Sequence, residues 1–300
     1  MSARSPNAKA ARKPGRERRP AALYVYCVGA REELAPLVEG AGVAPIETGA
    51  GVELVEGGGL AAVVSDVPLA DYGEDALRER LQDPAWMATR AMRHEAAVEH
   101  FARRAAVVPL RFGTIYLSRE AVEKMLAERG AQLRSIISRV EGREEWGVNV
   151  YADRLKTREA VARVSPRLLE MDEQAARSTP GQAYLLRKKI DALRADEARA
   201  ETKRAAASIE DALRAASEGA ARLRVLKDEA SEHGDLAAKL AFLVPRDAFE
   251  GFRAEAERLA QQFAPLGLRL ELTGPWPAYN FVVFDDEEGK RQKAKGKNQQ

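Results

Sequence analysis

The residue types that carry most enzyme chemistry are sparse in this sequence of 300 residues, which has three histidines and a single cysteine. His94 and His100 are six positions apart, and on a helix this spacing separates them by about 120°, so they cannot share a metal ion. His94 falls on an apolar helical stripe, a position typical of a hydrogen-bonded core histidine, and His233 lies in a charged segment. Cys27 lies within YVYCV and is expected to be a buried, inert thiol.

Motifs that would organise catalysis are missing from the sequence. There is no G-x-S-x-G, H-E-x-x-H, C-x-x-C or phosphate-binding G-K-S/T, and no carboxylate pair stands out from surface charge. The glycine run 57–59 lies between two predicted strands and indicates a hairpin turn, and the acidic run 285–288 lacks the spacing of calcium ligands. The sequence therefore favours a protein that is not an enzyme and needs no cofactor or metal. An enzyme that uses Arg111 and His94 across a cleft is a weaker alternative, which requires a cavity beside His94.

The stretch Ala106–Ser118, AVVPLRFGTIYLS, combines residue types that are unusual within one strand. Its period-two pattern predicts a buried strand with two faces, one made by Val108, Leu110, Phe112 and Tyr116 and the other by Pro109, Arg111, Gly113 and Ile115. The second face carries a proline without an N–H, a glycine without a side chain and an arginine that needs a partner. Spacing favours an edge or barrel-corner strand whose Arg111 pairs with a carboxylate. The alternative is a flat surface against which another chain can lie.

A second unusual stretch, TGPWPAYNFVVF, runs from Thr273 to Phe284. Trp276 stands between two prolines, and Tyr279 and Phe281 add aromatic area within five residues. The cluster is either a rigid plug that seals the end of a sheet or an anchor for a partner chain, because rigid aromatic side chains are favoured at interface hot spots.

The charge is unevenly distributed along the chain. The net charge of +2 separates into +6 for residues 1–20, −5 for residues 21–284 and +1 for residues 285–300. The two ends are expected to be disordered tails, the first basic and the second charged, and the acidic body does not resemble a nucleic-acid footprint. The basic start is followed by no apolar signal-peptide core, no run is apolar enough to cross a bilayer, and the single cysteine fits a reducing cytoplasm.

The first domain is expected to cover residues 21–141. Tyr24–Val28 is a continuous apolar run typical of a central strand, and residues 52–55 and 60–64 form a predicted hairpin. One helix is expected from Asp71 and a second after Asp83-Pro84, with an apolar stripe made by Met87, Ala91, His94, Val98 and Phe101. Ser118 should cap a third helix that Gly142 ends, with a buried face made by Val122, Leu126, Leu133, Ile136 and Val140.

The second domain is expected to cover residues 142–284. A strand over residues 146–150 precedes helices broken at Ser165-Pro166 and a long helix, Gln182–Ala220, that is polar in its middle and should project or bridge. Two strands, a helix that Asp247 caps and a strand from Leu268 complete the order. The predicted fold is therefore α+β with two domains, the second a modified ferredoxin-like (split βαβ) sandwich with a long extra helical segment.

Several segments resemble the gas vesicle protein GvpL/GvpF family. They are YVYCV, RHEAAVEHFARRAAVVPLRFGTIY, EEWGVNVYAD, LAAKLAFLVPRDAF and LTGPWPAYNFVVF, in family order over residues 22–284. PLRFGT and GPWPAYNF are the specific pieces, and Ala278 departs mildly from the family's usual GPWPPYNF.

The resemblance implies a two-domain α+β protein that is not an enzyme and works in cytoplasmic gas vesicles. It implies a minor shell component or assembly factor that binds the major shell protein GvpA and other accessory Gvp proteins, and it leaves the oligomeric state open. The residues expected to meet a partner are Pro109, Arg111, Phe112, Gly113, Trp276 and Tyr279. The alternative function is a cytoplasmic polyanion-binding protein that acts through its basic tails, with no specific nucleic-acid site and no membrane.

Overall fold

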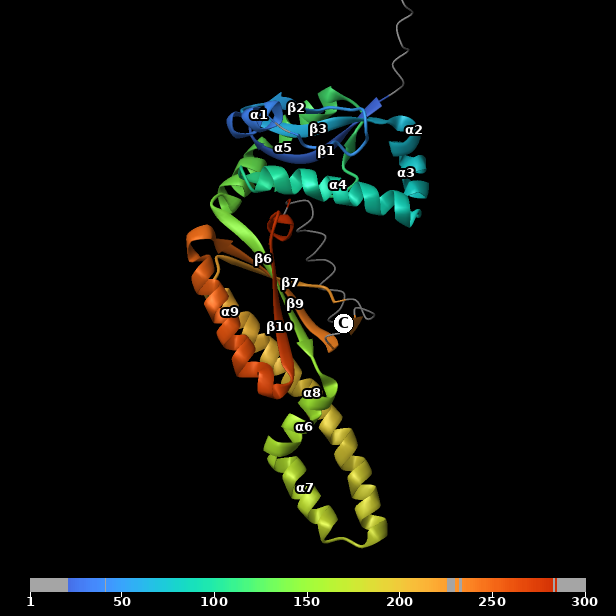
Figure 1. The fold of residues 1–300 in the computed structure, drawn as a ribbon, viewed down its shortest axis with the longest axis vertical. Coiled ribbons are helices and arrows are strands. Elements are labelled where there is room, and N and C mark those ends of the chain that lie inside the picture. The colour runs from blue at the N-terminus through green and yellow to red at the C-terminus, as the bar shows by residue number, and fades with distance from the viewer. Residues whose placement is uncertain (1–20, 41, 226–229, 232–233, 283, 285–300) are drawn as a thin grey trace, which may run out of the picture.

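The structure is a computed structural model that describes residues 21–40, 42–225, 230–231, 234–282 and 284 (Figure 1). The two expected tails and His233 lie outside the described residues. The expected α+β class is confirmed, because helices accompany two separate antiparallel sheets.

The first sheet is built from residues 21–116 and has the strand order β2-β3-β1-β4, with β5 also pairing with β1. Its elements are β1 (Ala21–Ala30), α1 (Arg31–Glu39), β2 (Val52–Gly57), β3 (Leu60–Pro68), α2 (Leu69–Tyr72), α3 (Glu74–Arg80), α4 (Pro84–Ala102), β4 (Val107–Pro109), β5 (Ile115–Tyr116) and α5 (Arg119–Val140). The expected central strand is confirmed as β1, which lies between β3 and the β4–β5 segment. The single helix expected from Asp71 is wrong, because Gly73 separates α2 from α3.

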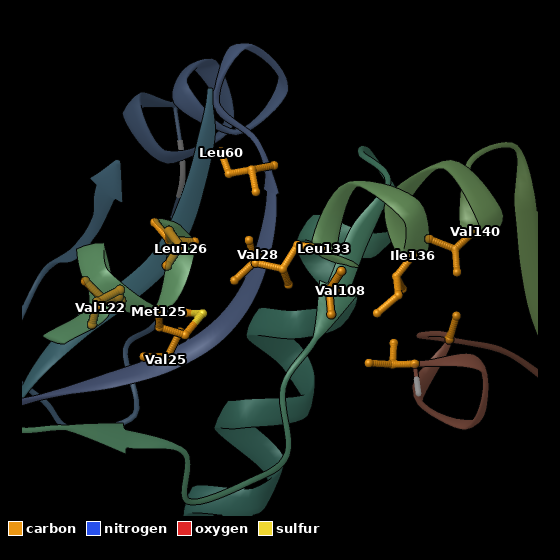
Figure 2. Packing of buried hydrophobic residues seen from close by; sticks show 14 of the residues in the cluster. Val25, Val28, Leu60, Val108, Val122, Met125, Leu126, Leu133, Ile136 and Val140 are labelled. Atoms are coloured by element: carbon orange, nitrogen blue, oxygen red, sulfur yellow. The ribbon is translucent and has the colours of Figure 1, made fainter. Parts of the chain in front are cut away.

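Strand β1 is apolar throughout because helices cover both faces of its sheet. Val25 and Val28 point toward α5, as Figure 2 shows, whereas Tyr24 and Tyr26 belong to the cluster on the α4 side. A bulge between Val25 and Cys27 shifts the register within the strand. Burial on both faces explains a continuous apolar run in place of alternation.

Local signals place the turns and caps of this half correctly. Gly58 and Gly59 form a two-residue turn at φ of 59° and 81°, a conformation that favours glycine. The Asp83 side chain accepts hydrogen bonds from the first N–H groups of α4, and the Ser118 hydroxyl accepts one from the backbone N–H at the start of α5. The apolar stripe of α4 is wrong at Met87, which is 40% exposed.

The single strand expected over Ala106–Ser118 is wrong. The backbone N–H of Leu110 still donates to the Tyr26 carbonyl, and the Thr114 carbonyl accepts from the Val25 N–H, but residues 111–113 leave the pairing in a tight turn. Gly113 takes a φ of 82° there, and the Thr114 N–H and hydroxyl both donate to the Arg111 carbonyl. The turn moves Phe112 from the expected face to the α4 side of the sheet, beside Ile115.

The second sheet has the strand order β10-β6-β9-β7, with β8 pairing with β9. Its elements are β6 (Arg143–Ala152), α6 (Arg154–Val164), α7 (Pro166–Ala176), α8 (Pro180–Ala215), β7 (Gly219–Leu223), β8 (Ala230–Ser231), β9 (Gly234–Pro245), η1 (Arg246–Ala248), α9 (Phe249–Phe263), η2 (Ala264–Leu266), β10 (Leu268–Trp276) and η3 (Tyr279–Phe281). The helix break at Ser165-Pro166 is confirmed. The cap expected from Asp247 is wrong, because a 3-10 turn precedes α9 and no side chain caps the helix.

Helix α8 ends at Ala215, earlier than expected, and it bridges two packed clusters. Near its start, Ile190 packs with Leu168 of α7, and near its end Ile209 and Leu213 pack with α9 against one face of the second sheet. Figure 1 shows the α7–α8 hairpin extending beyond the end of that sheet. The bridging role expected for a long helix with weak end stripes is therefore confirmed.

The two sheets share one apolar cluster. Leu133 and Ile136 of α5 belong to the same cluster as Leu243 of β9 and as Phe281 and Val282 after β10. Helix α5 therefore packs against the first sheet and also contacts the last segment of the described chain.

Candidate functional site

The two unusual stretches of the sequence meet in the structure. Tyr279 reaches α4, where its hydroxyl lies 3.1 Å from Nε2 of His94 and donates to Oε1 of Glu95 at 3.2 Å. Phe112, in the turn between β4 and β5, packs edge-on against the rings of Tyr24 and His94 at centroid distances of 6.3 and 5.8 Å. Residues far apart in the sequence thus form one aromatic cluster around His94.

A chain of hydrogen bonds runs through this cluster. The N–H of Gly113 donates to the Tyr24 hydroxyl at 3.0 Å, and that hydroxyl lies 2.9 Å from Nδ1 of His94. The Tyr279 hydroxyl donates its single proton to Glu95. Toward Nε2 of His94 it can therefore act only as an acceptor. The donors are therefore consistent with a neutral His94 that carries its proton on Nε2.

His94 is fully buried, and burial lowers its pKa to about 4. A hydrogen bond between its ring and the backbone of Leu110 acts in the opposite direction. The ring therefore stays neutral at physiological pH, which agrees with the hydrogen-bond chain. Burial likewise raises the pKa of Tyr24 and of Tyr279, so both hydroxyls remain protonated. The cluster is a stable set of neutral donors and acceptors.

A buried carboxylate holds the second stretch from the other side. Glu145 of β6 is 4% exposed, and it accepts the backbone N–H of Asn280 at 2.9 Å and the Asn280 side-chain amide at 2.5 Å. Burial raises the pKa of Glu145 to about 7, although both bonds from Asn280 act in the opposite direction. Tyr279 and Asn280 are thus fixed by groups from α4 and β6 respectively.

A hollow of about 320 Å³, called here the motif hollow, opens beside this junction. Its wall combines apolar side chains with two arginines: Pro109, Leu110, Arg111, Thr114, Tyr116, Met125, Arg129, Leu133, Tyr279, Asn280, Val282 and Phe284. The Arg129 guanidinium lies 5.0 Å from the centre of the Phe284 ring, which is a cation–π contact. Such a wall suits an apolar segment of a partner that carries hydrogen-bond acceptors or negative charge.

Trp276 lies at a second, smaller hollow of about 200 Å³, together with Pro275 and Pro277. Its indole N–H donates to the Thr273 hydroxyl at 3.2 Å, and the residue is 54% exposed. The plug interpretation of the aromatic cluster is therefore wrong at Trp276, whereas Phe281 of the same cluster is buried. The ring is held in place and faces outward.

Most of the sequence matches a known protein family. The family described as "Gas vesicle synthesis protein GvpL/GvpF" matches residues 22–283 of this chain. The chain belongs to the GvpL/GvpF family. Its role is therefore in gas vesicles.

Relatives within the GvpL/GvpF family include two proteins of Streptomyces sp. (strain CB03234). Gas vesicle protein L is 29% identical over 76% of this chain and 82% of its own length, and gas vesicle protein F is 30% identical over 74% and 84%. Gas vesicle protein L2 of Halobacterium salinarum is 27% identical over 58% of this chain and 63% of its own length. Sequence likeness thus extends to both the L and the F proteins.

Solved GvpF structures share this fold. The crystal structure of GvpF from Anabaena sp. PCC7120 superposes with a TM-score of 0.64 at 18% identity, and covers 88% of this chain and 99% of its own. GvpF from Microcystis aeruginosa gives a TM-score of 0.59 at 17% identity with the same coverage. The arrangement of two antiparallel sheets is therefore that of GvpF.

The six residues expected to meet a partner fall into three positions. Pro109, Arg111 and Tyr279 line the motif hollow, and Trp276 lines the smaller one. Phe112 is packed in the aromatic cluster and Gly113 shapes the turn, so these two support the surface from beneath.

Sequence reasoning missed Glu145, and the alternation of β6 explains why. Glu145, Gly147 and Asn149 alternate with the apolar positions of the strand, so a period-two pattern assigns them to solvent. At Glu145 the segment after β10 covers that face, which no local pattern indicates. The only sequence signal was that Glu145 lies within EEWGVNVYAD, one of the segments that resemble the family.

The geometry at His94 contradicts the hypothesis of an enzyme that uses His94 and Arg111 across a cleft. Both ring nitrogens lie at hydrogen-bond distance from tyrosine hydroxyls, and the residue has no exposed surface with which to meet a substrate. Within the described residues, no group of three or more His, Cys, Asp or Glu side chains could hold a metal ion, and no helix is long and apolar enough to cross a membrane.

Proposed function

We propose that this protein is a non-enzymatic minor shell component or assembly factor that binds the major shell protein GvpA and other accessory Gvp proteins during gas vesicle formation in the cytoplasm. The observation that supports this most is that PLRFGT and GPWPAYNF, the segments that most resemble the family, meet around the motif hollow, whose wall is partly apolar. The alternative of a polyanion-binding protein has no support from the comparisons, and the tails on which it depends lie outside the described residues.

The physical need for such a partner follows from what a gas vesicle shell must be. A shell subunit presents an apolar face to gas, and before assembly that face is liable to aggregate in water. A partner with a rigid, partly apolar surface could shield the subunit until it joins the shell. The motif hollow and the outward-facing Trp276 ring together offer such a surface.

We also propose a division into two domains, 21–141 and 142–284, the second a modified ferredoxin-like unit. In support, the second unit runs strand, helices, strand, strand, helix, strand with the sheet order β10-β6-β9-β7, apart from the short β8. Helices α6, α7 and the first half of α8 are then the additional segment.

Variants that alter the surface without altering the core test the proposed function. Arg111 and Trp276 are exposed side chains at the two hollows, so Arg111→Glu and Trp276→Ala should each weaken capture of co-expressed GvpA about tenfold or more. Arg187→Glu and Tyr184→Ala are matched controls, because both residues are exposed near the start of α8, and they should leave capture unchanged. Thermal unfolding should show that Trp276→Ala costs less than about 1 kcal/mol.

Equal capture of GvpA, identified by antibody, by all four variants would show that the two hollows are not the contact. Deleting residues 22–141 is a poorer test, because α5 and β1 share an apolar cluster with β9 and Phe281, and the deletion would expose it.

A further inference from the structure

A third hollow, of about 410 Å³, lies away from the two motif segments, where α6 and α8 run past the end of the second sheet (Figure 1). Its floor is made of small side chains from β6, α8 and β9: Ala152, Ala195, Ala198 and Ala237. Its rim carries five cationic side chains from α6, α8 and β7: Arg154, Arg158, Arg199, Lys203 and Arg222. Among the described residues that line it, Asp235 is the single carboxylate. We call this hollow the basic groove.

Among the described residues of the basic groove, positive charge exceeds negative charge even after ion pairing. Asp235 pairs with Arg154, Asp196 with Arg199, and Glu210 with Arg222, but Glu210 also serves Arg214. Within the described part of the chain, Arg158 and Lys203 form no ion pair. Pairs such as Arg199–Asp196, whose side chains are largely exposed, contribute little stability. The arginine of such a pair can therefore leave its partner for an incoming carboxylate.

The spacing of the cations suits a polypeptide better than a compact phosphate. Arg154 and Arg158 lie one turn apart on α6, and Arg199 and Lys203 lie one turn apart on α8. The two cations of each pair are therefore about 6 Å apart. Carboxylates repeat at nearly the same distance along an acidic helix or an extended chain. A phosphate site at the start of α6 is disfavoured, because the Leu155 and Lys156 N–H groups already donate to Asp153.

We propose that the basic groove binds an acidic segment of a partner protein, one in which Asp or Glu recurs at one-turn or two-residue intervals. Nucleic acid is a poorer occupant than a short acidic segment, because its long phosphate backbone would continue past the groove along a body whose net charge is −5 over residues 21–284. The inference stands on the charges of the groove and does not depend on the proposed binding of GvpA at the motif hollow.

The test measures binding of a fluorescent peptide of about ten glutamates to the full chain by anisotropy, at low salt and at about 0.3 M salt. Arg158→Glu/Lys203→Glu reverses the two cations that have no ion pair. Arg187→Glu/Lys189→Glu makes the same charge change on the exposed side of α8 outside the groove. Residues 1–20 are common to both variants, so their attraction for the peptide cancels in the comparison.

We expect the groove variant to lower peptide affinity about tenfold or more and the control variant to change it less than about twofold, with the difference shrinking at high salt. Equal losses in the two variants would show general charge attraction and overturn the proposal. Tighter binding of tripolyphosphate than of the peptide, lost in the groove variant alone, would also overturn it in favour of a phosphate site. Matching thermal unfolding of the two variants establishes that both are folded.

Discussion

At the scale of single residues, the protein fixes Tyr279 by hydrogen bonds to groups that lie far away in the sequence. His94 is 185 positions from Tyr279, and its ring lies between the hydroxyls of Tyr24 and Tyr279 with no contact to solvent. When a buried polar group loses its hydrogen-bond partner, stability falls by the full desolvation penalty of that group. The hydroxyl of Tyr279 should therefore matter more for stability than its partly exposed position indicates.

Tyr279→Phe should lower the free energy of unfolding by about 1–3 kcal/mol, because it removes the hydroxyl that bonds both to Nε2 of His94 and to the Glu95 carboxylate. Urea unfolding measures the change. Tyr184→Phe removes a hydroxyl from an exposed tyrosine and should change stability by less than about 0.5 kcal/mol. Equal effects of the two substitutions would mean that the hydrogen-bond chain contributes nothing.

The buried Glu145 should make stability depend on pH. Its pKa rises from 4.5 to about 7 on folding, so its protonated form is favoured in the folded state. Its stabilising contribution is complete below pH 4.5 and is lost as the pH rises through 7. Over this range, the free energy of unfolding of the wild-type protein should fall by up to about 3 kcal/mol relative to that of Glu145→Gln. Urea unfolding at several pH values measures the difference.

His94 acts in the opposite direction over nearly the same range. Its pKa falls from 6.5 to about 4 on folding, so its contribution is complete above pH 6.5 and is lost as the pH falls toward 4. In the wild-type protein, the pH dependences of these two contributions should therefore partly cancel. Glu145→Gln should lose stability more steeply than the wild type as the pH falls. A stability difference between wild type and Glu145→Gln that does not vary with pH would contradict the assignment of Glu145.

At the scale of elements, the α7–α8 hairpin is a unit with its own small core. Leu168 and Ile190 pack there with Val161 of α6, and Leu266 of η2 packs both against this cluster and against the one that α8 forms with the second sheet near Ile209. A hairpin with few buried contacts should open without unfolding the rest of the chain.

Ile190→Ala should therefore raise amide hydrogen exchange in α7 and the first half of α8 and leave the exchange of β1 unchanged. Leu133→Ala offers the comparison, because Leu133 belongs to the cluster that both sheets share, and it should raise exchange throughout. Faster exchange of β1 in Ile190→Ala would mean that the hairpin does not open on its own.

Elements specified by neighbouring residues could be predicted from the sequence. The glycine turn between β2 and β3, the Asp83 and Ser118 caps and the break at Ser165-Pro166 each depend on a few adjacent residues. The family segments also pointed to Tyr279 and Arg111 as site residues, and both line the motif hollow.

Features that depend on tertiary contacts could not be predicted. The turn at residues 111–113 interrupts a run with clear strand alternation, and it forms where β1 has its own bulge. Glu145 has the pattern of a surface position until the segment after β10 covers it. From its neighbours alone, Trp276 could be assigned to a plug or to an anchor. Its exposure excludes the plug, and the anchor stays a prediction.

At the scale of the whole molecule, α5 joins the two sheets into one folding unit. The cluster that contains Leu133 and Ile136 includes side chains of β1 and β3 as well as of β9 and η3. A shared apolar core couples the unfolding of the parts that contribute to it.

The chain should therefore unfold in a single transition. Trp86 lies in the first half, and Trp146 and Trp276 lie in the second. Trp86→Phe therefore reports on the second half, and the double variant Trp146→Phe/Trp276→Phe reports on the first. In each variant, the urea midpoint from fluorescence should coincide with that from circular dichroism. Two separated midpoints would show that the halves unfold independently.

The proposed function requires that the surface built where PLRFGT meets GPWPAYNF binds other gas vesicle proteins. The most direct test places a photo-crosslinking amino acid at Thr114, at Trp276 or at Tyr184, one position at a time, in cells that form gas vesicles. We expect a crosslink to GvpA or to an accessory Gvp protein from positions 114 and 276 and none from position 184. Crosslinks from position 184 alone, or from no position in cells that assemble vesicles normally, would contradict it.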